Sequence, residues 1–126
     1  MNDSQLEGTK LANFTPLPKV AELQIIDTVE GTGETVPEGA TITAHYTGAL
    51  CVDGTIFQSS HDFDEPITFP LDRVIAGWTE GVPGMKVGGT RRLIIPSEKA
   101  YGSVRAAANI PPNSDLVFDI ELVAIK

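Results

Sequence analysis

The sequence predicts an α+β domain in which many antiparallel strands pack with one short helix. Three observations lead to this fold class. Short apolar segments alternate with polar residues along most of the chain, and only one segment has the apolar spacing of a helix. In addition, the 12 glycines and 9 prolines make up about a sixth of the 126 residues, a share that is typical of many turns and short strands.

Residues 1–20 are expected to form an irregular arm ahead of a single domain at residues 21–126. Glycine and proline interrupt this arm, and its apolar positions follow neither the strand period nor the helix period. Phe14 and Leu17 are the residues that would pin the arm to the domain, and a loose leader is the equally supported alternative. The total length fits one domain with its own core.

Strand signals begin at residues 23–26 and are clearest at residues 41–50, where apolar and polar residues alternate as in a half-buried strand. The residues predicted to share one face are Ile42, Ala44, Tyr46 and Gly48. Those predicted on the other face are Thr41, Thr43, His45 and Thr47. Asp53 and Gly54 predict a tight turn, and two short strand candidates follow at residues 56–57 and 67–69.

One segment has the spacing of a helix, and its apolar residues are Val74, Ile75, Trp78 and Val82. A Pro-Gly pair follows it, so the helix is expected to have about two or three turns. A helix this short is stable only against a sheet, so these residues are predicted to be buried. Strands resume at residues 90–96 and 116–125. The residues of the last strand predicted to point inward are Leu116, Phe118, Ile120, Leu122 and Ala124.

Charge and composition restrict the partners and the compartment. Nine basic and 17 acidic residues give a formal net charge of −8, which argues against nucleic acid or an anionic membrane as the main partner. No apolar run approaches the roughly 18 residues of a membrane-spanning helix, and the single cysteine, Cys51, forms no internal disulfide. Because the N-terminus has no signal-peptide pattern, we expect a cytoplasmic protein or a soluble domain of a longer exported one.

The familiar catalytic patterns are weak in this sequence. Ser60, His61 and Asp62 supply three residue types of a catalytic triad, but adjacent side chains of a loop point apart. His45 and His61 with one cysteine are too few for a zinc site, so surface histidines are the favoured interpretation. The aromatic residues carry more information, although an isolated aromatic residue is usually part of a core.

Seven short segments, taken together and in order, resemble the FKBP-type peptidyl-prolyl cis–trans isomerases. The resemblance runs from about Leu23 to Lys126, some four fifths of the chain, and its specificity comes from the ordered set. The segments are AHYTG at 44–48, DGTIF at 53–57, VIAGW at 74–78, EGV at 80–82, AYG at 100–102, IPP at 110–112 and LVFDIEL at 116–122.

This resemblance implies a twisted antiparallel sheet of five to six strands that curls around one short helix. It also implies an enzyme that assists protein folding by rotating Xaa-Pro bonds, in an apolar pocket, with no cofactor and no metal. Its partners would be proline-containing polypeptides and tacrolimus- or rapamycin-like macrolides, and it would be a monomer. The alternative is a module that binds prolyl segments, or a chaperone, with little catalysis.

The resemblance further assigns roles to residues of the pocket. Trp78 would form the floor, and Ile75 N–H and the Tyr101 hydroxyl would bind carbonyl oxygens of the substrate. The residues implied in catalysis are Tyr101, Phe57 and Trp78. Those implied in substrate binding are Tyr46, Gln58, Ile67, Val74, Ile75, Ile110 and Phe118.

Several positions depart from the common family pattern. Gln58 replaces a frequent Asp, Phe63 a frequent Arg, Ile67 a frequent Phe, and Asn109 an apolar residue. We expect the apolar pocket to be retained and the affinity for macrolides to differ. Residues 81–114 carry five basic residues and one acidic residue, which either line one rim that attracts acidic segments or are dispersed over the surface.

Overall fold

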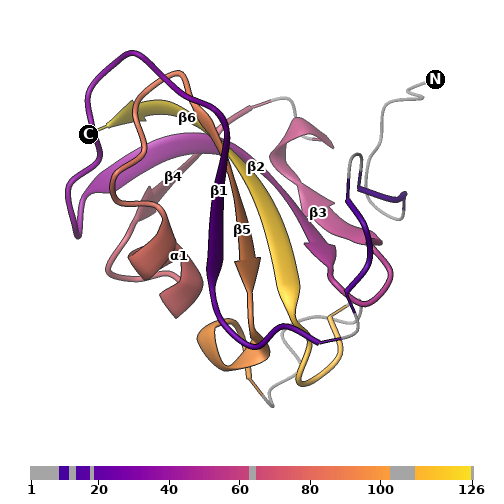
Figure 1. Cartoon of the computed structure of the whole chain (residues 1–126). Coiled ribbons are helices and arrows are strands. Elements are labelled where there is room, and N and C mark those ends of the chain that lie inside the picture. Colours follow the sequence, from indigo (N-terminus) through magenta and orange to yellow (C-terminus); the bar gives the residue numbers. More distant parts are fainter. Residues whose placement is uncertain (1–8, 12–13, 18, 63–64, 103–109, 126) are drawn as a thin grey trace.

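The computed structural model describes residues 9–11, 14–17, 19–62, 65–102 and 110–125. In this part of the chain six antiparallel strands form one twisted sheet that curls past a short helix (Figure 1). The strands are β1 (Gln24–Val29), β2 (Thr41–Leu50), β3 (Ile56–Ser59), β4 (Ile67–Pro70), β5 (Thr90–Ile95) and β6 (Leu116–Ile125). The helix is α1 (Ala76–Gly81), and η1 (Ser60–Asp62) and η2 (Ser97–Lys99) are single 3₁₀ turns. The predicted fold class is confirmed.

Strand β2 occupies a central place in the strand order β1-β5-β6-β2-β3. One side of β2 pairs with β6 from Ile42 to Leu50. Its other side pairs with β4 over residues 41–44 and with β3 over residues 47–49. Between these two pairings the chain leaves the sheet through η1, so neither β3 nor β4 pairs with residues 45–46 of β2.

Several predicted elements have different bounds in the structure, most clearly the first strand and the helix. The predicted first strand is longer, because β1 pairs with β5 as far as Val29. The predicted helix is shorter, because Val74 and Ile75 precede α1. Ile75 is extended (φ −60°, ψ 151°), and its carbonyl accepts hydrogen bonds from the N–H groups of Trp78 and Thr79. No helix in the described ranges is long and apolar enough to cross a membrane.

The main core lies between α1 and the face of the sheet that α1 covers. Leu93, Ile95, Phe118 and Ile120 project from this face, and Trp78 packs on them from the helix. Gly77 allows the close approach of the helix, since a Cβ atom there would lie 2.6 Å from side-chain atoms of Ile95. The buried Trp78 therefore fixes α1 on the sheet, as predicted for so short a helix.

The opposite face of the sheet has its own smaller core, which the N-terminal arm covers. Val117 and Ile94 project to this side because side chains alternate along a strand, and they are buried with Leu11. The Leu11 N–H donates to Gly54 O (2.8 Å). Phe14 and Leu17, named above as the residues that would pin the arm, pack partly buried against this cluster.

Cys51 belongs to the same smaller core and is completely buried. Burial raises the pKa of the Cys51 thiol to about 12, with a smaller contribution from the negative charge of Asp115. The thiol is therefore neutral at physiological pH and serves as a small apolar side chain.

Arg91 connects the helix to two strands. Its guanidinium, almost completely buried, donates from Nη1 to the carbonyls of Gly81 (2.8 Å) and Pro83 (3.2 Å) at the end of α1. Nε and Nη2 donate to the two carboxylate oxygens of Asp27 in β1, at 2.6 and 3.1 Å. Such a two-point contact fixes geometry better than a single ion pair.

We predict that Asp27→Asn destabilises the protein at pH 7 and that the effect becomes smaller in acid. The hydrogen bond from Arg91 holds the pKa of Asp27 below its usual range, against the opposing effect of burial. A lowered pKa in the folded state adds stability above the ordinary value of about 3.9, and this stability is lost as the pH falls through the lowered pKa. We expect a loss of about 1 kcal/mol at pH 7, because Asp27 is half exposed.

Urea unfolding at pH 7 and at pH 3 measures this difference. Asp72→Asn is the control, since Asp72 is exposed and makes no ion pair in the described ranges. An equal loss of stability in the two variants at pH 7 would contradict the assigned contribution of Arg91.

Candidate functional site

A cavity of about 500 Å³ opens beside α1 where β2, β3, β4 and β6 come together with two loops. Its lining is mostly aromatic and aliphatic, with a few polar groups, as in most small-molecule sites. The lining residues are Tyr46, Phe57, Gln58, Phe69, Arg73, Val74, Ile75, Trp78, Tyr101 and Phe118.

Trp78 is one of the most deeply buried residues of the lining and is only 4% exposed. Three aromatic rings contact its indole in edge-on geometry: Phe69 at 4.9 Å, Phe118 at 5.3 Å and Tyr46 at 5.7 Å between ring centroids. Trp78 Nε1 is buried and has no hydrogen-bond partner in the described residues. The indole is therefore held by ring packing, a favourable geometry for aromatic pairs.

Phe57 and Phe118 form a wall whose position depends on a glycine. Their rings meet edge to face at 5.7 Å, above Gly48 of β2. A Cβ atom on Gly48 would lie 2.6 Å from Cζ of Phe57 and 2.7 Å from Cε1 of Phe118. Both distances are shorter than any ordinary carbon–carbon contact, so only glycine lets the two rings lie this close to the strand.

Polar groups with free hydrogen-bonding capacity line the cavity. The N–H of Ile75, the hydroxyls of Tyr46 and Tyr101 and the amide of Gln58 have no hydrogen-bond partner among the described residues. Burial raises the pKa of both phenols, and for Tyr46 the nearby Tyr101 adds to this rise. Both hydroxyls are therefore protonated at neutral pH and able to donate hydrogen bonds.

Ser60 anchors the open edge of β2 and so positions Tyr46. Its completely buried hydroxyl accepts from the Tyr46 N–H (2.8 Å), lies 3.3 Å from Tyr46 O, and bonds Nδ1 of His45 at 2.9 Å. This Ser–His contact is structural, because the hydroxyl is inaccessible.

His45 stacks on His61, whose Nε2 bonds Glu121 at 2.6 Å. No metal-binding group of three His, Cys, Asp or Glu occurs within the described residues.

The structure brings together eight of the ten residues assigned from the resemblance, all but Ile67 and Ile110. Ile67 lies two residues along β4 from Phe69, on the same face, and Phe69 lines the cavity in its place. Ile110 is buried in the main core. Phe69 and Arg73 line the cavity but were not assigned to it from the sequence. Phe69 could have been found, because it is apolar and shares a face of β4 with Ile67, whereas nothing in the pattern indicated Arg73.

Some expectations fall on residues outside the described part. Phe63 and Asn109, two departures from the family pattern, are among these, as is Arg105 of the basic segment at 81–114. The other four basic residues of that segment are all in ion pairs within the fold; they are Lys86, Arg91, Arg92 and Lys99. In the described residues the segment therefore presents no free basic rim.

Comparison with known proteins places this geometry in a family. Residues 32–123 match the family model described as FKBP-type peptidyl-prolyl cis-trans isomerase. The chain belongs to this family. It is 51% identical over 90 residues to peptidyl-prolyl cis-trans isomerase FPR2 of Saccharomyces cerevisiae, covering 70% of this chain and 67% of that protein. The resemblance inferred from the ordered segments is thus confirmed.

Two further comparisons show how much of each relative is matched. An FK506-binding protein of Neisseria meningitidis is 46% identical over 108 residues, with 84% of this chain and 98% of that protein covered. The crystal structure of FkpA from Escherichia coli matches with a TM-score of 0.75 and 44% identity, covering 82% of this chain and 48% of that chain. The chain thus spans nearly all of one relative and about half of the other.

We predict that Gly48→Ala disturbs the wall of the cavity. The added methyl group forces the rings of Phe57 and Phe118 away from β2, and overpacking of this kind costs about 1–3 kcal/mol. Urea unfolding measures the loss of stability. In a Phe57→Leu background the same substitution is expected to cost less, because the smaller side chain makes room; an identical cost in both backgrounds would show that Phe57 is not the obstacle.

Proposed function

We propose that the cavity above Trp78 is where this protein binds the proline of an Xaa-Pro segment and accelerates its cis–trans isomerisation. One observation supports this most strongly: an aromatic cavity whose lining holds hydrogen-bond donors that no described residue pairs with, in a chain of the FKBP-type isomerase family. A volume of about 500 Å³ lies within the usual range of about 300–1,000 Å³ for small-ligand sites. It leaves room for a prolyl ring and its flanking peptide groups.

The chemistry of the reaction suits an apolar cavity. Rotation about an Xaa-Pro bond has a barrier of about 18–20 kcal/mol, because it breaks amide resonance. The planar amide carries partial negative charge on its oxygen, which water solvates well, and the twisted amide carries less. Aromatic walls do not replace this solvation of the planar amide, so they favour the twisted state. Binding that is tighter in the transition state accelerates the reaction.

The polar groups of the lining hold the peptide on either side of the rotating bond. In our proposal the Ile75 N–H and the Tyr101 hydroxyl donate to carbonyl oxygens of the substrate, while Trp78 and Phe57 contact the prolyl ring. Tyr46, Val74 and Phe118 complete the apolar surface. Holding the flanking chain in one orientation removes part of the entropic cost of reaching the twisted geometry.

The proposed substrates are proline-containing polypeptides. Tacrolimus- and rapamycin-like macrolides are proposed as competing ligands of the same cavity, since the Neisseria meningitidis relative is named an FK506-binding protein. The residue that we expect to modulate this binding is Gln58, an exposed and uncharged amide in the lining.

We predict that the protein accelerates the cis-to-trans relaxation of an Xaa-Pro peptide and that Tyr101→Phe slows this catalysis. Tyr101 is 40% exposed and its hydroxyl has no protein partner in the described chain, so its loss should leave stability nearly unchanged. A net hydrogen bond of about 0.5–1.5 kcal/mol corresponds to a fall in kcat/KM of roughly two- to tenfold. Protease-coupled or fluorescence relaxation assays measure the rate.

Val52→Ala is the matched control, because Val52 is 65% exposed and does not line the cavity. Binding of the peptide without any acceleration would support the alternative of a prolyl-binding module. Full activity in Tyr101→Phe would exclude the hydroxyl from the mechanism.

We also predict that Gln58→Asp strengthens tacrolimus binding more than it raises turnover. A carboxylate at this place would accept hydrogen bonds from the phenols of Tyr46 and Tyr101, which would order both rings before the ligand binds. Isothermal titration with tacrolimus, next to kcat/KM for one peptide, measures the two effects. Unchanged tacrolimus affinity would contradict this role of position 58.

A further inference from the structure

Arg73 is the charged residue among those that line the cavity in the described structure. It is exposed, and its N–H donates to Pro70 O, which fixes the turn between β4 and the segment before α1. Its guanidinium makes no ion pair and no hydrogen bond with any described residue. The lining thus combines aromatic walls with one positive charge that no carboxylate of the described residues compensates.

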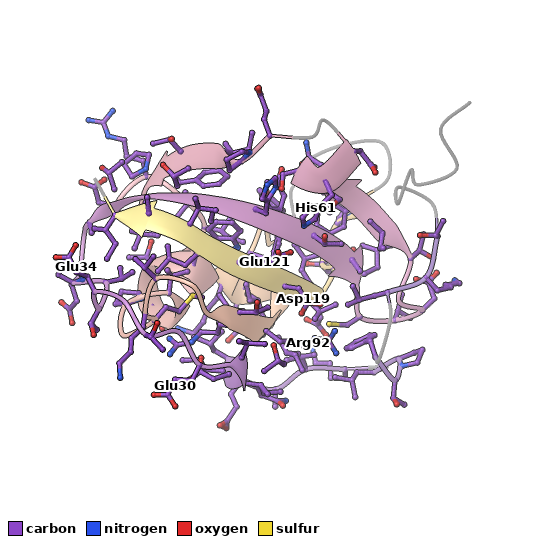
Figure 2. All side chains as sticks on the ribbon, turned by 90° about the horizontal axis from the view of Figure 1, so that it is seen from above. Glu30, Glu34, His61, Arg92, Asp119 and Glu121 are labelled. Carbon is purple, nitrogen blue, oxygen red and sulfur yellow. The ribbon has the colours of Figure 1, made fainter. Side chains whose placement is uncertain are left out.

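Most of the other cations in the described chain behave differently. Five of them pair with carboxylates: Lys10 with Asp53, Lys86 with Glu30, Arg91 with Asp27, Arg92 with Asp119 and Lys99 with Glu80. Figure 2 shows Arg92 beside Asp119 and His61 beside Glu121, on the face of the sheet away from α1. Only Lys19 and Arg73 remain without such a partner in the described residues. Lys19 lies in the N-terminal arm, outside the cavity.

From this arrangement we infer that Arg73 selects substrates with a carboxylate side chain close to the proline. The inference rests on the proposed function of the cavity. Arg73 precedes Ile75 by two residues, so their Cα atoms are at most about 7 Å apart. When a carbonyl of the bound peptide accepts from the Ile75 N–H, the peptide side chains one or two residues from the proline therefore lie within reach of the Arg73 guanidinium.

The charge acts locally rather than through the field of the whole protein. The net charge of −8 repels acidic peptides at long range, so a preference for them must come from a nearby cation. Arg73 lines the same cavity as the groups proposed to hold the peptide, so its charge acts on a bound carboxylate over a short distance, where attraction is strongest. Gln58, the other long polar side chain of the lining, is uncharged and does not compensate Arg73.

Matched peptides test this selectivity. One set differs only in the residue before proline, which is Glu, Gln or Lys, and a second set carries the same three residues after proline. We expect kcat/KM for the Glu peptide to exceed that for the Gln peptide about two- to fivefold in at least one set at low ionic strength, as for an exposed ion pair. The Lys peptide should be the poorest substrate of that set, and added salt should narrow the differences.

Variants at two positions separate the local charge from the total charge. Arg73→Lys is expected to retain the preference for Glu, and Arg73→Glu to invert it in favour of Lys. Lys19→Glu changes the net charge by the same amount as Arg73→Glu but lies outside the cavity, so it should retain the wild-type ratio. Each ratio compares peptides on the same variant, which makes it independent of the amount of folded protein.

The outcomes distinguish this inference from the proposed function beneath it. Acceleration of all peptides with equal kcat/KM for Glu and Gln would overturn the role of Arg73 and leave the proposed function standing. An equal change of the ratio in Lys19→Glu and Arg73→Glu would also overturn it, in favour of a general charge effect. No acceleration of any peptide would overturn both.

Discussion

The packing of Trp78 against the curled sheet is the contact on which the rest of the site depends. Helix α1 has only six residues, too few to be stable in isolation, and no side chain caps its start. Burial of the indole among Tyr46, Phe69 and Phe118 holds the helix in place. The same rings that order the helix also form the apolar surface of the cavity, so the core and the site share one set of contacts.

Several polar contacts then fix this helix relative to neighbouring parts of the fold. Arg91 binds the carbonyls at the end of α1 and the carboxylate of Asp27 in β1. Lys99 of η2 donates to Glu80 of α1 at 2.8 Å, close to the turn that carries Tyr101. The helix, the edge strand and the Tyr101 turn are thereby joined, which limits their relative movement.

The edge of β2 that contributes Tyr46 to the cavity has an interrupted strand pairing. A continuous partner strand would cover residues 45–46, whereas here β3 and β4 divide that edge between them. Ser60 satisfies the Tyr46 N–H that a partner strand would otherwise bind. An unpaired buried N–H costs about 1–3 kcal/mol, so this hydroxyl allows the sheet to open at the site with little loss of stability.

The sequence by itself determined the element types and most of the lining. The bounds of β2 and β6 were predicted because burial of one face imposes alternation along a strand, and eight lining residues were named because seven short segments occur in a specific order. Tertiary structure decided the rest. Phe69, whose ring lies 4.9 Å from the indole of Trp78, lines the cavity, whereas Ile67 stands two residues, about 7 Å, away along the same face of β4 and is not among the lining residues.

Charge partners were likewise decided only by the fold. Arg91 and Asp27 are 64 residues apart in the chain. From the sequence alone, the basic residues of 81–114 could form one unpaired patch, and only the fold shows the carboxylates that pair with four of them. Net charge is a property of composition, whereas the pairing of each charge depends on which strands become neighbours. The Gly and Pro content first indicated turns. Two of these glycines have another role: Gly48 lets the rings of Phe57 and Phe118 lie close to the sheet, and Gly77 lets the helix do so. This role is visible only in the tertiary structure.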